Sequence, residues 1–109
     1  NMFGDIITDM GAQLCGGMGV AASGNIHPGK TSLFEPVHGS APKYAGKDIA
    51  NPLAAILTVG VMLETIGYPE WTPRLEDIVR EMVKSGKVPR DMGGPLGTAG
   101  VGDVVCEMI

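Results

Sequence analysis

Basic residues, cysteines and long hydrophobic runs are scarce in this chain of 109 residues, and each shortage excludes a class of protein. The 8 Lys and Arg residues are outnumbered by 12 Asp and Glu residues and form no basic cluster, so nucleic acid is not expected as a partner. The two cysteines, Cys15 and Cys106, lie far apart, which excludes a paired-cysteine metal site and predicts the reduced thiols of a cytoplasmic protein. No apolar run approaches the roughly 20 residues that cross a bilayer, so no membrane is expected either.

Two common signatures, one of nucleotide binding and one of hydrolysis, are also absent from the sequence. Without a Gly-x-Gly-x-x-Gly turn, any nucleotide would have to bind in a manner unlike that of Rossmann domains. Without a Gly-x-Ser-x-Gly elbow, the chain lacks the serine nucleophile of the α/β-hydrolases. The chain begins at Asn1 rather than at an initiator methionine, and we interpret it as a piece of a longer protein.

The first half of the chain is predicted to contain one helix and two short strands. Apolar residues at helical spacing predict a helix over residues 4–15, which ends at a glycine pair because glycine readily adopts the left-handed conformation. Short apolar runs at 18–22 and 32–37 are strand candidates, separated by a turn-rich loop over 23–30. Residues 38–50 contain too many glycines and too little periodicity for regular structure, so a loop is expected there.

A helix with apolar residues on nearly every side is expected next. Asn51 followed by Pro52 is a strong start for a helix over residues 53–66, whose composition requires burial on several sides. The two strands are too short to form an independently stable sheet, and this helix has more apolar surface than its visible neighbours can cover. The rest of the protein, or another subunit, is therefore expected to complete the core.

Two amphipathic helices are expected in the last third of the chain. Thr72 and Pro73 begin the first one, in which apolar residues recur at i, i+3, i+4, i+7 and i+8 while charged residues cover the other face. Gly86 ends that helix. Thr98 is expected to cap the last helix, after a glycine-rich loop.

Asp5 and Asp9 are the only charged residues before Lys30. Four positions apart on a helix, their side chains lie on one face, where like charges repel unless a cation lies between them. Carboxylate oxygens of this kind suit a hard cation such as Mg²⁺ or Mn²⁺. The alternative is that both acids simply favour the positive end of the helix dipole.

Residues 33–52 combine the kinds of groups that hold an adenosine cofactor. His38 offers a ring for stacking, the Gly-Ser pair after it offers backbone amides for phosphate, and Lys43 with Tyr44 offers a cation and a phenol for a ribose or its phosphate. Each group also has an ordinary explanation: His38 as a hydrogen-bonded loop histidine, Lys43 as a solvated charge, and Asn51 as the cap of the next helix. The two roles of Asn51 are compatible, because its side-chain oxygen can cap the helix and leave the amide NH₂ for a base.

Two parts of the sequence resemble the β-decarboxylating dehydrogenases, a family that includes 3-isopropylmalate, isocitrate, homoisocitrate and tartrate dehydrogenases. Residues 1–9 with 16–19 resemble the family's metal-binding segment, and residues 33–52 resemble its adenosine-binding loop nearly letter for letter. The resemblance implies an α/β fold, of which this chain is a C-terminal fragment: the two-domain isopropylmalate dehydrogenase-like fold, with non-Rossmann nucleotide binding, mostly helical with a few short strands in this piece. Residues 1–16 would end the small dimerisation domain and carry the metal-ligand helix, and residues 17–109 would belong to the large nucleotide-binding domain.

The resemblance also assigns site residues. Asp5 and Asp9 become ligands of Mg²⁺ or Mn²⁺, with a third aspartate supplied by the partner subunit. On the nucleotide side, His38 would lie against the adenine, Asn51 would hydrogen-bond the adenine edge, and Glu35 would lie near the nicotinamide-side ribose. The complete set expected to bind NAD or NADP is Glu35, His38, Gly39, Ser40, Ala41, Pro42, Lys43, Tyr44 and Asn51.

Lys43 and Tyr44 occupy the positions that distinguish NAD from NADP in this family. NAD-specific members usually carry an acid where Lys43 stands, since a carboxylate accepts hydrogen bonds from the free ribose hydroxyls and repels a phosphate. Lysine reverses both effects, and the tyrosine hydroxyl can donate to a phosphate oxygen. The sequence therefore favours NADP and leaves NAD open.

The reaction implied by the resemblance is hydride transfer from the C2 alcohol of a 2-hydroxy acid to the nicotinamide, followed by loss of the C3 carboxylate. The family's catalytic lysine and tyrosine and its substrate-binding arginines would lie outside this chain, in a homodimer, so no catalytic residue is assigned here. The segment around Pro36 favours 3-isopropylmalate as the substrate, whereas Lys43 and Tyr44 favour the isocitrate branch, so isocitrate, homoisocitrate and tartrate stay open. A nucleotide-binding or regulatory subunit without turnover is the alternative from another class.

Overall fold

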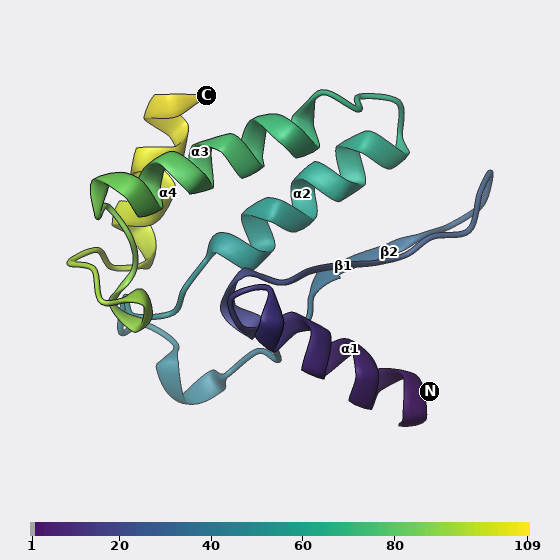
Figure 1. The fold of residues 1–109 in the computed structure, drawn as a ribbon, viewed down its shortest axis with the longest axis horizontal. Coiled ribbons are helices and arrows are strands. Elements are labelled where there is room, and N and C mark those ends of the chain that lie inside the picture. Colours follow the sequence, from purple (N-terminus) through teal and green to yellow (C-terminus); the bar gives the residue numbers. More distant parts are fainter. Residues whose placement is uncertain (1) are drawn as a thin grey trace.

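The computed structural model describes residues 2–109 and consists mainly of helices with one two-stranded sheet (Figure 1). The α-helices are α1 (Met2–Leu14), α2 (Leu53–Thr65), α3 (Trp71–Ser85) and α4 (Thr98–Met108). The strands are β1 (Ala22–Asn25) and β2 (Leu33–Pro36), and three short 3₁₀ turns complete the structure: η1 (Met18–Val20), η2 (Pro42–Tyr44) and η3 (Arg90–Met92). The predicted mixture of helices and short strands is confirmed. Within the described residues, no helix combines the length and the apolar character needed to cross a membrane.

The sheet begins later than the sequence predicts. The strand expected over 18–22 is wrong, because its first residues form the 3₁₀ turn η1, and β1 starts only at Ala22 and continues into the loop expected over 23–30. β1 pairs antiparallel with β2, with Ala22 opposite Pro36 and Asn25 opposite Leu33. The predicted strand over 32–37 is confirmed as β2. An isolated apolar run says little about a strand's bounds, because a strand is defined by its partner.

Helix α2 lies at the centre of the chain, between α3 on one side and the β1–β2 hairpin with η1 on the other (Figure 1). Leu53 on α2, Met82 on α3 and Val101 on α4 have no exposed surface and form the middle of the hydrophobic core. Gly60 permits α2 and α3 to approach closely, since a Cβ there would lie 3.3 Å from Thr72 Cα. The expected burial of α2 on several sides is confirmed, although Val59 keeps 45% of its surface exposed.

Two of the predicted helix starts are confirmed, and one predicted cap is wrong. Asn51 caps α2 as expected, because its Oδ1 accepts a hydrogen bond from Leu53 N at 2.9 Å. The start predicted at Thr72 and Pro73 is confirmed to within one residue, since α3 begins at Trp71, and the Thr72 hydroxyl donates to Glu64 Oε2 at 2.7 Å. Thr98 is the first residue of α4 rather than its cap, because its hydroxyl donates to the carbonyl of Ala50, 48 positions away.

Helix α1 stands apart from this core. It packs against η1, and the C-terminal end of the helix is held by a hydrogen bond from Gly17 N to Ala12 O at 2.9 Å. Ala12 of this helix is buried, but its large apolar residues are exposed in the chain: Ile7 keeps 71% of its surface and Leu14 keeps 90%. Burial of such side chains is worth about 1.5–3 kcal/mol each, so α1 has an apolar side that the described residues do not use.

Candidate functional site

A groove of about 1010 Å³ lies where α1, the β1–β2 hairpin, α2 and the start of α3 face one another. It brings together residues that the sequence predicts for two different parts of a site: Asp5 and Asp9 from α1, and Glu35, His38 and Gly39 from the end of β2 and the loop that follows it. The metal-ligand candidates and the first part of the nucleotide-binding loop therefore share one groove.

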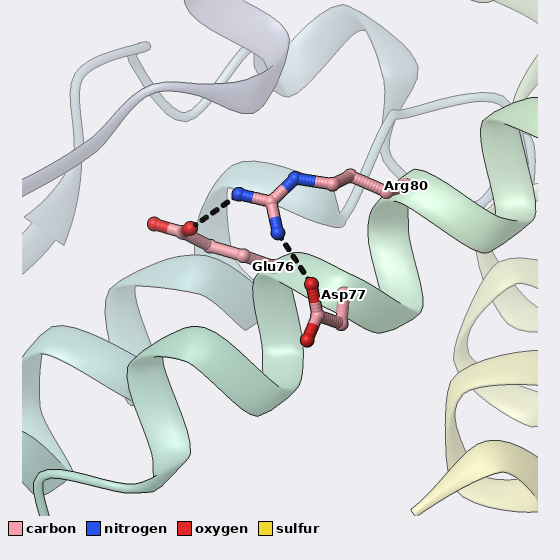
Figure 2. A network of polar contacts seen from close by, with 3 residues as sticks. All are labelled: Glu76, Asp77 and Arg80. Atoms are coloured by element: carbon pink, nitrogen blue, oxygen red, sulfur yellow. Dashed lines mark hydrogen bonds and ion pairs between the residues drawn. The ribbon is translucent and has the colours of Figure 1, made fainter.

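The two aspartates lie exposed on the groove side of α1. Neither forms an ion pair among residues 2–109, where the ion pairs are those of Arg80 with Glu76 and Asp77 (Figure 2). Glu76 also lines the groove, but the Arg80 guanidinium lies 2.8 Å from its Oε2 and compensates its charge. Asp5 and Asp9 are thus groove carboxylates without a cation from the described part of the chain.

This donor set fits a hard divalent cation in part. Two carboxylates one helical turn apart are the kind of ligand that Mg²⁺ or Mn²⁺ takes, together with water and substrate oxygens. No group of three or more His, Cys, Asp and Glu side chains that could hold a metal occurs within residues 2–109. Among the described residues, the donors that a cation in this groove would find on α1 are the two carboxylates of Asp5 and Asp9.

The His38 ring is held by its own loop. Nδ1 lies 2.9 Å from the Gly39 carbonyl oxygen, and because a carbonyl only accepts, Nδ1 carries the hydrogen and donates it. The other ring nitrogen, Nε2, is shielded from solvent and has no hydrogen-bond partner in the described structure. A buried polar atom without a partner costs about 1–3 kcal/mol, which a ligand that reaches this nitrogen would recover.

The later part of the predicted nucleotide site does not line the groove. Ser40 through Tyr44 are exposed and continue away from His38 into the turn η2, before which Ala41 adopts a left-handed φ of 42°. Lys43 Nζ lies 4.9 Å from the centre of the Tyr44 ring, so the two residues that are expected to select the nucleotide contact each other. The structure unites Glu35, His38 and Gly39 with the aspartates and separates Lys43 and Tyr44 from them.

Asn51 has a partner that sequence reasoning missed. Besides capping α2 through Oδ1, it donates an N–H from Nδ2 to Asp91 Oδ2 at 3.0 Å. The amide expected to remain free for a base is therefore already half engaged. Gly19 makes room for the pair, since a Cβ there would lie 3.0 Å from Asn51 Nδ2 and 3.2 Å from Asp91 Oδ2. Nothing local in the sequence indicates Asp91, because it lies 40 positions from Asn51.

Asp48 was also missed. Its Oδ1 accepts a hydrogen bond from Ala99 N at 2.8 Å, so this loop residue caps α4 in place of Thr98. In the sequence Asp48 is followed by Ile-Ala-Asn, which is not a capping pattern. Its partner Ala99 lies 51 positions away, so no local signal indicates this role.

Known proteins match the whole chain. A family model described as isocitrate/isopropylmalate dehydrogenase matches residues 1–105. A 3-isopropylmalate dehydrogenase of Archaeoglobus fulgidus is 46% identical over 100% of this chain and 33% of its own length. A homoisocitrate dehydrogenase of Methanocaldococcus jannaschii is 47% identical over 100% of this chain and 31% of its own. A probable tartrate dehydrogenase/decarboxylase of Bacillus subtilis is 44% identical, again over 100% and 31%.

Solved structures agree with these matches. The isocitrate dehydrogenase from Methylococcus capsulatus superposes with a TM-score of 0.89 at 45% identity, covering 99% of this chain and 32% of that one. The apo form of a β-decarboxylating dehydrogenase from Thermococcus kodakarensis has a TM-score of 0.86 at 41% identity, covering 99% and 32%. The chain thus spans about a third of the length of the relatives it matches.

Proposed function

Because this chain belongs to the isocitrate/isopropylmalate dehydrogenase family, we propose that it forms part of a metal-dependent oxidoreductase that oxidises a 2-hydroxy acid with NAD(P) and decarboxylates the product. The observation that carries the proposal is the groove in which Asp5 and Asp9 lie together with Glu35, His38 and Gly39. A hydroxy acid held there would have carboxylates for a metal on one wall and the nucleotide loop on another.

Asp5 and Asp9 would hold Mg²⁺ or Mn²⁺. Support comes from their position on one face of α1, their place in the groove and the lack of a cationic partner among residues 2–109. A divalent ion bound there would supply Lewis-acid stabilisation of the negative charge that develops on the substrate oxygen. The aspartates themselves would orient the substrate hydroxyl toward the nucleotide side of the groove, where the hydride leaves C2 for the nicotinamide ring.

The nucleotide would bind along the loop that begins at Glu35. His38, already oriented by the Gly39 carbonyl, would face the adenine, and Asn51 would use its remaining N–H for the adenine edge. Exposed Lys43 and Tyr44 support NADP over NAD, because the Lys43 ammonium lies over the Tyr44 ring and an ammonium and a phenol are both groups that bind phosphate. Lys43 would attract the phosphate as a point charge, and Tyr44 would donate to one of its oxygens.

We prefer 3-isopropylmalate as the substrate, from the Glu-Pro-Val-His segment that starts at Glu35. Isocitrate, homoisocitrate and tartrate are the alternatives, since relatives named for three different substrates are 44% to 47% identical to this chain. The groups that choose among these acids would lie in the two thirds of the relatives that the chain does not span.

The complete protein would be a cytoplasmic homodimer with two domains. Residues 1–16 would end the small domain, and residues 17–109 would belong to the large one. The exposed apolar side of α1, with Ile7 and Leu14, supports a second copy at this helix, because an apolar patch of this kind marks an interface in soluble proteins. A dimer would also bring the third metal ligand that residues 2–109 do not provide.

The test is turnover by the full-length protein. We expect reduced nicotinamide to form from NADP with Mg²⁺ or Mn²⁺ and one of the four hydroxy acids, and carbon dioxide to appear in equal amount. Chelation of the metal should stop both. A full-length protein that binds NADP but reduces it with none of these acids would refute the proposed enzymatic activity. It would support a nucleotide-binding or regulatory subunit instead.

A further inference from the structure

The loop that starts at His38 is joined at its far end to helix α4. Asp48 Oδ1 accepts from Ala99 N at 2.8 Å, and the Thr98 hydroxyl donates to the carbonyl of Ala50 at 2.5 Å. In both bonds the donor belongs to α4 and the acceptor to the loop, and the two segments lie about 50 positions apart in the chain. They clamp the last residues of the loop to the first turn of the helix.

The backbone at this clamp has an uncommon conformation. Asp48 has a φ of 51°, in the left-handed region that asparagine and aspartate tolerate better than most residues. A residue in that region persists when the surrounding contacts determine it, and here the contact is the bond to α4. The conformation turns the chain so that Ala50 and Asn51 reach α4 and α2 in succession.

Gly97 provides the space for the clamp. Its φ of −85° is open to any residue, so glycine is not needed there for its backbone freedom. A Cβ at this position would lie 2.6 Å from the Asp48 carbonyl oxygen and closer still to the Asp48 carboxylate. Either contact would push the loop away from α4.

Little else holds the middle of the loop. The side chains of residues 40–48 are exposed, and the local bonds are short turns such as Tyr44 N to Ala41 O at 2.9 Å. Directly after the clamp, Asn51 ties the chain to α2 and η3. The hydrogen bond of Asp48 to α4 therefore orders the segment between Lys43 and Asn51. Asp48 itself is not one of the residues predicted to bind the nucleotide.

We infer that Asp48 is a positioning residue, which holds the nucleotide-binding loop against α4 and thereby raises the affinity for NAD(P). The inference rests on the proposed function. Ordering a free loop on binding costs conformational entropy, so a loop that is ordered beforehand binds its nucleotide more tightly. Asp48 and Thr98 do not line the groove that holds Asp5, Asp9 and Glu35, so the rate of hydride transfer should change little.

The test compares full-length wild type with Asp48→Ala, Asp48→Asn and Asp103→Ala. Asp103 is exposed on α4, so its variant removes an acid from the same helix without touching the clamp. We expect Asp48→Ala to raise the KM for NADP about five- to tenfold with kcat within about twofold, as the loss of a helix cap predicts. Asp48→Asn should restore the wild-type KM, because its Oδ1 accepts the same bond and the residue tolerates the same φ.

A second variant and a second measurement keep the inference testable if Asp48→Ala does not fold. Thr98→Val removes the other bond of the clamp at nearly constant volume and should raise the KM in the same direction by a smaller factor. Amide hydrogen exchange over residues 41–50 should become faster in Asp48→Ala and stay unchanged in Asp103→Ala.

Two different failures remain distinguishable. A wild type that turns over while Asp48→Ala keeps the KM of Asp103→Ala would overturn the inference and leave the proposed function intact. A wild type that neither turns over nor binds NADP would overturn the proposed function, and the role of Asp48 in nucleotide binding with it.

Discussion

Helix α1 and the three later helices use their side chains in opposite ways. In α2, α3 and α4 the apolar faces meet one another, and Leu53, Met82 and Val101 are fully buried. In α1 the acids line a groove and the apolar side is exposed. The difference teaches that the later helices bury their apolar faces against one another, whereas the apolar side of α1 is left without a partner among the described residues.

The largest expected effect comes from the core. Met82→Ala should lower the free energy of unfolding of the full-length protein by about 2–5 kcal/mol, because it leaves a cavity between α3 and its neighbours. Denaturant titration measures the change. Its Tm shift should be the same at low and at high protein concentration, since the cavity lies within one chain.

Ile7→Ala is the matched change on α1, where 71% of the side chain is exposed in this chain. If a second copy covers this side, the loss of stability should grow as the protein is diluted. A loss of stability equal to that of Met82→Ala and independent of protein concentration would contradict the difference between α1 and the later helices. It would place Ile7 in a core within one full-length chain.

A hundredfold effect is expected on activity with little effect on stability. Asp9→Asn should lower kcat/KM by about a hundredfold, or about 2.7 kcal/mol, because an amide removes the negative charge of one of the two proposed metal ligands. Raising the Mg²⁺ concentration should recover part of the loss, and Asp103→Asn should show none of it. If the Asp9→Asn enzyme depends on the metal concentration as the wild type does, α1 is not part of the metal site.

A smaller change is expected in nucleotide choice. Lys43→Asp should shift the ratio of kcat/KM for NADP and NAD about tenfold toward NAD, because a carboxylate repels the additional phosphate. Steady-state rates with both nucleotides measure this ratio. A wild type that prefers NAD would contradict the expected role of Lys43.

The smallest effect belongs to the ion pairs of α3. Arg80 lies between Glu76 and Asp77 with 60% of its side chain exposed (Figure 2), and exposed pairs of this kind contribute about 0.2–1 kcal/mol. Arg80→Ala should therefore lower the free energy of unfolding by less than about 1 kcal/mol, and the difference should fall further in high salt. A larger loss would show that Arg80 also packs against parts of the protein outside this chain.

Local patterns predicted much of the fold. The period of α3, the left-handed Gly86 at its end and the cap by Asn51 depend on residues within one or two turns, so the sequence is enough to recognise them. The strand at 18–22 and the cap by Thr98 were wrong. β1 is defined by its pairing with β2, and the Thr98 hydroxyl finds its acceptor 48 positions away in the chain.

The sequence by itself determined the family, the aspartate pair of α1 and the order of the nucleotide loop, since each depends on residue types at short spacing. Only the tertiary structure decided that Asp91 engages Asn51 and that Asp48 caps α4. Those contacts join residues 40 and 51 positions apart. A single hydrogen bond between such residues leaves no periodic trace in the chain, and it forms only when the packing of the helices brings its two ends together.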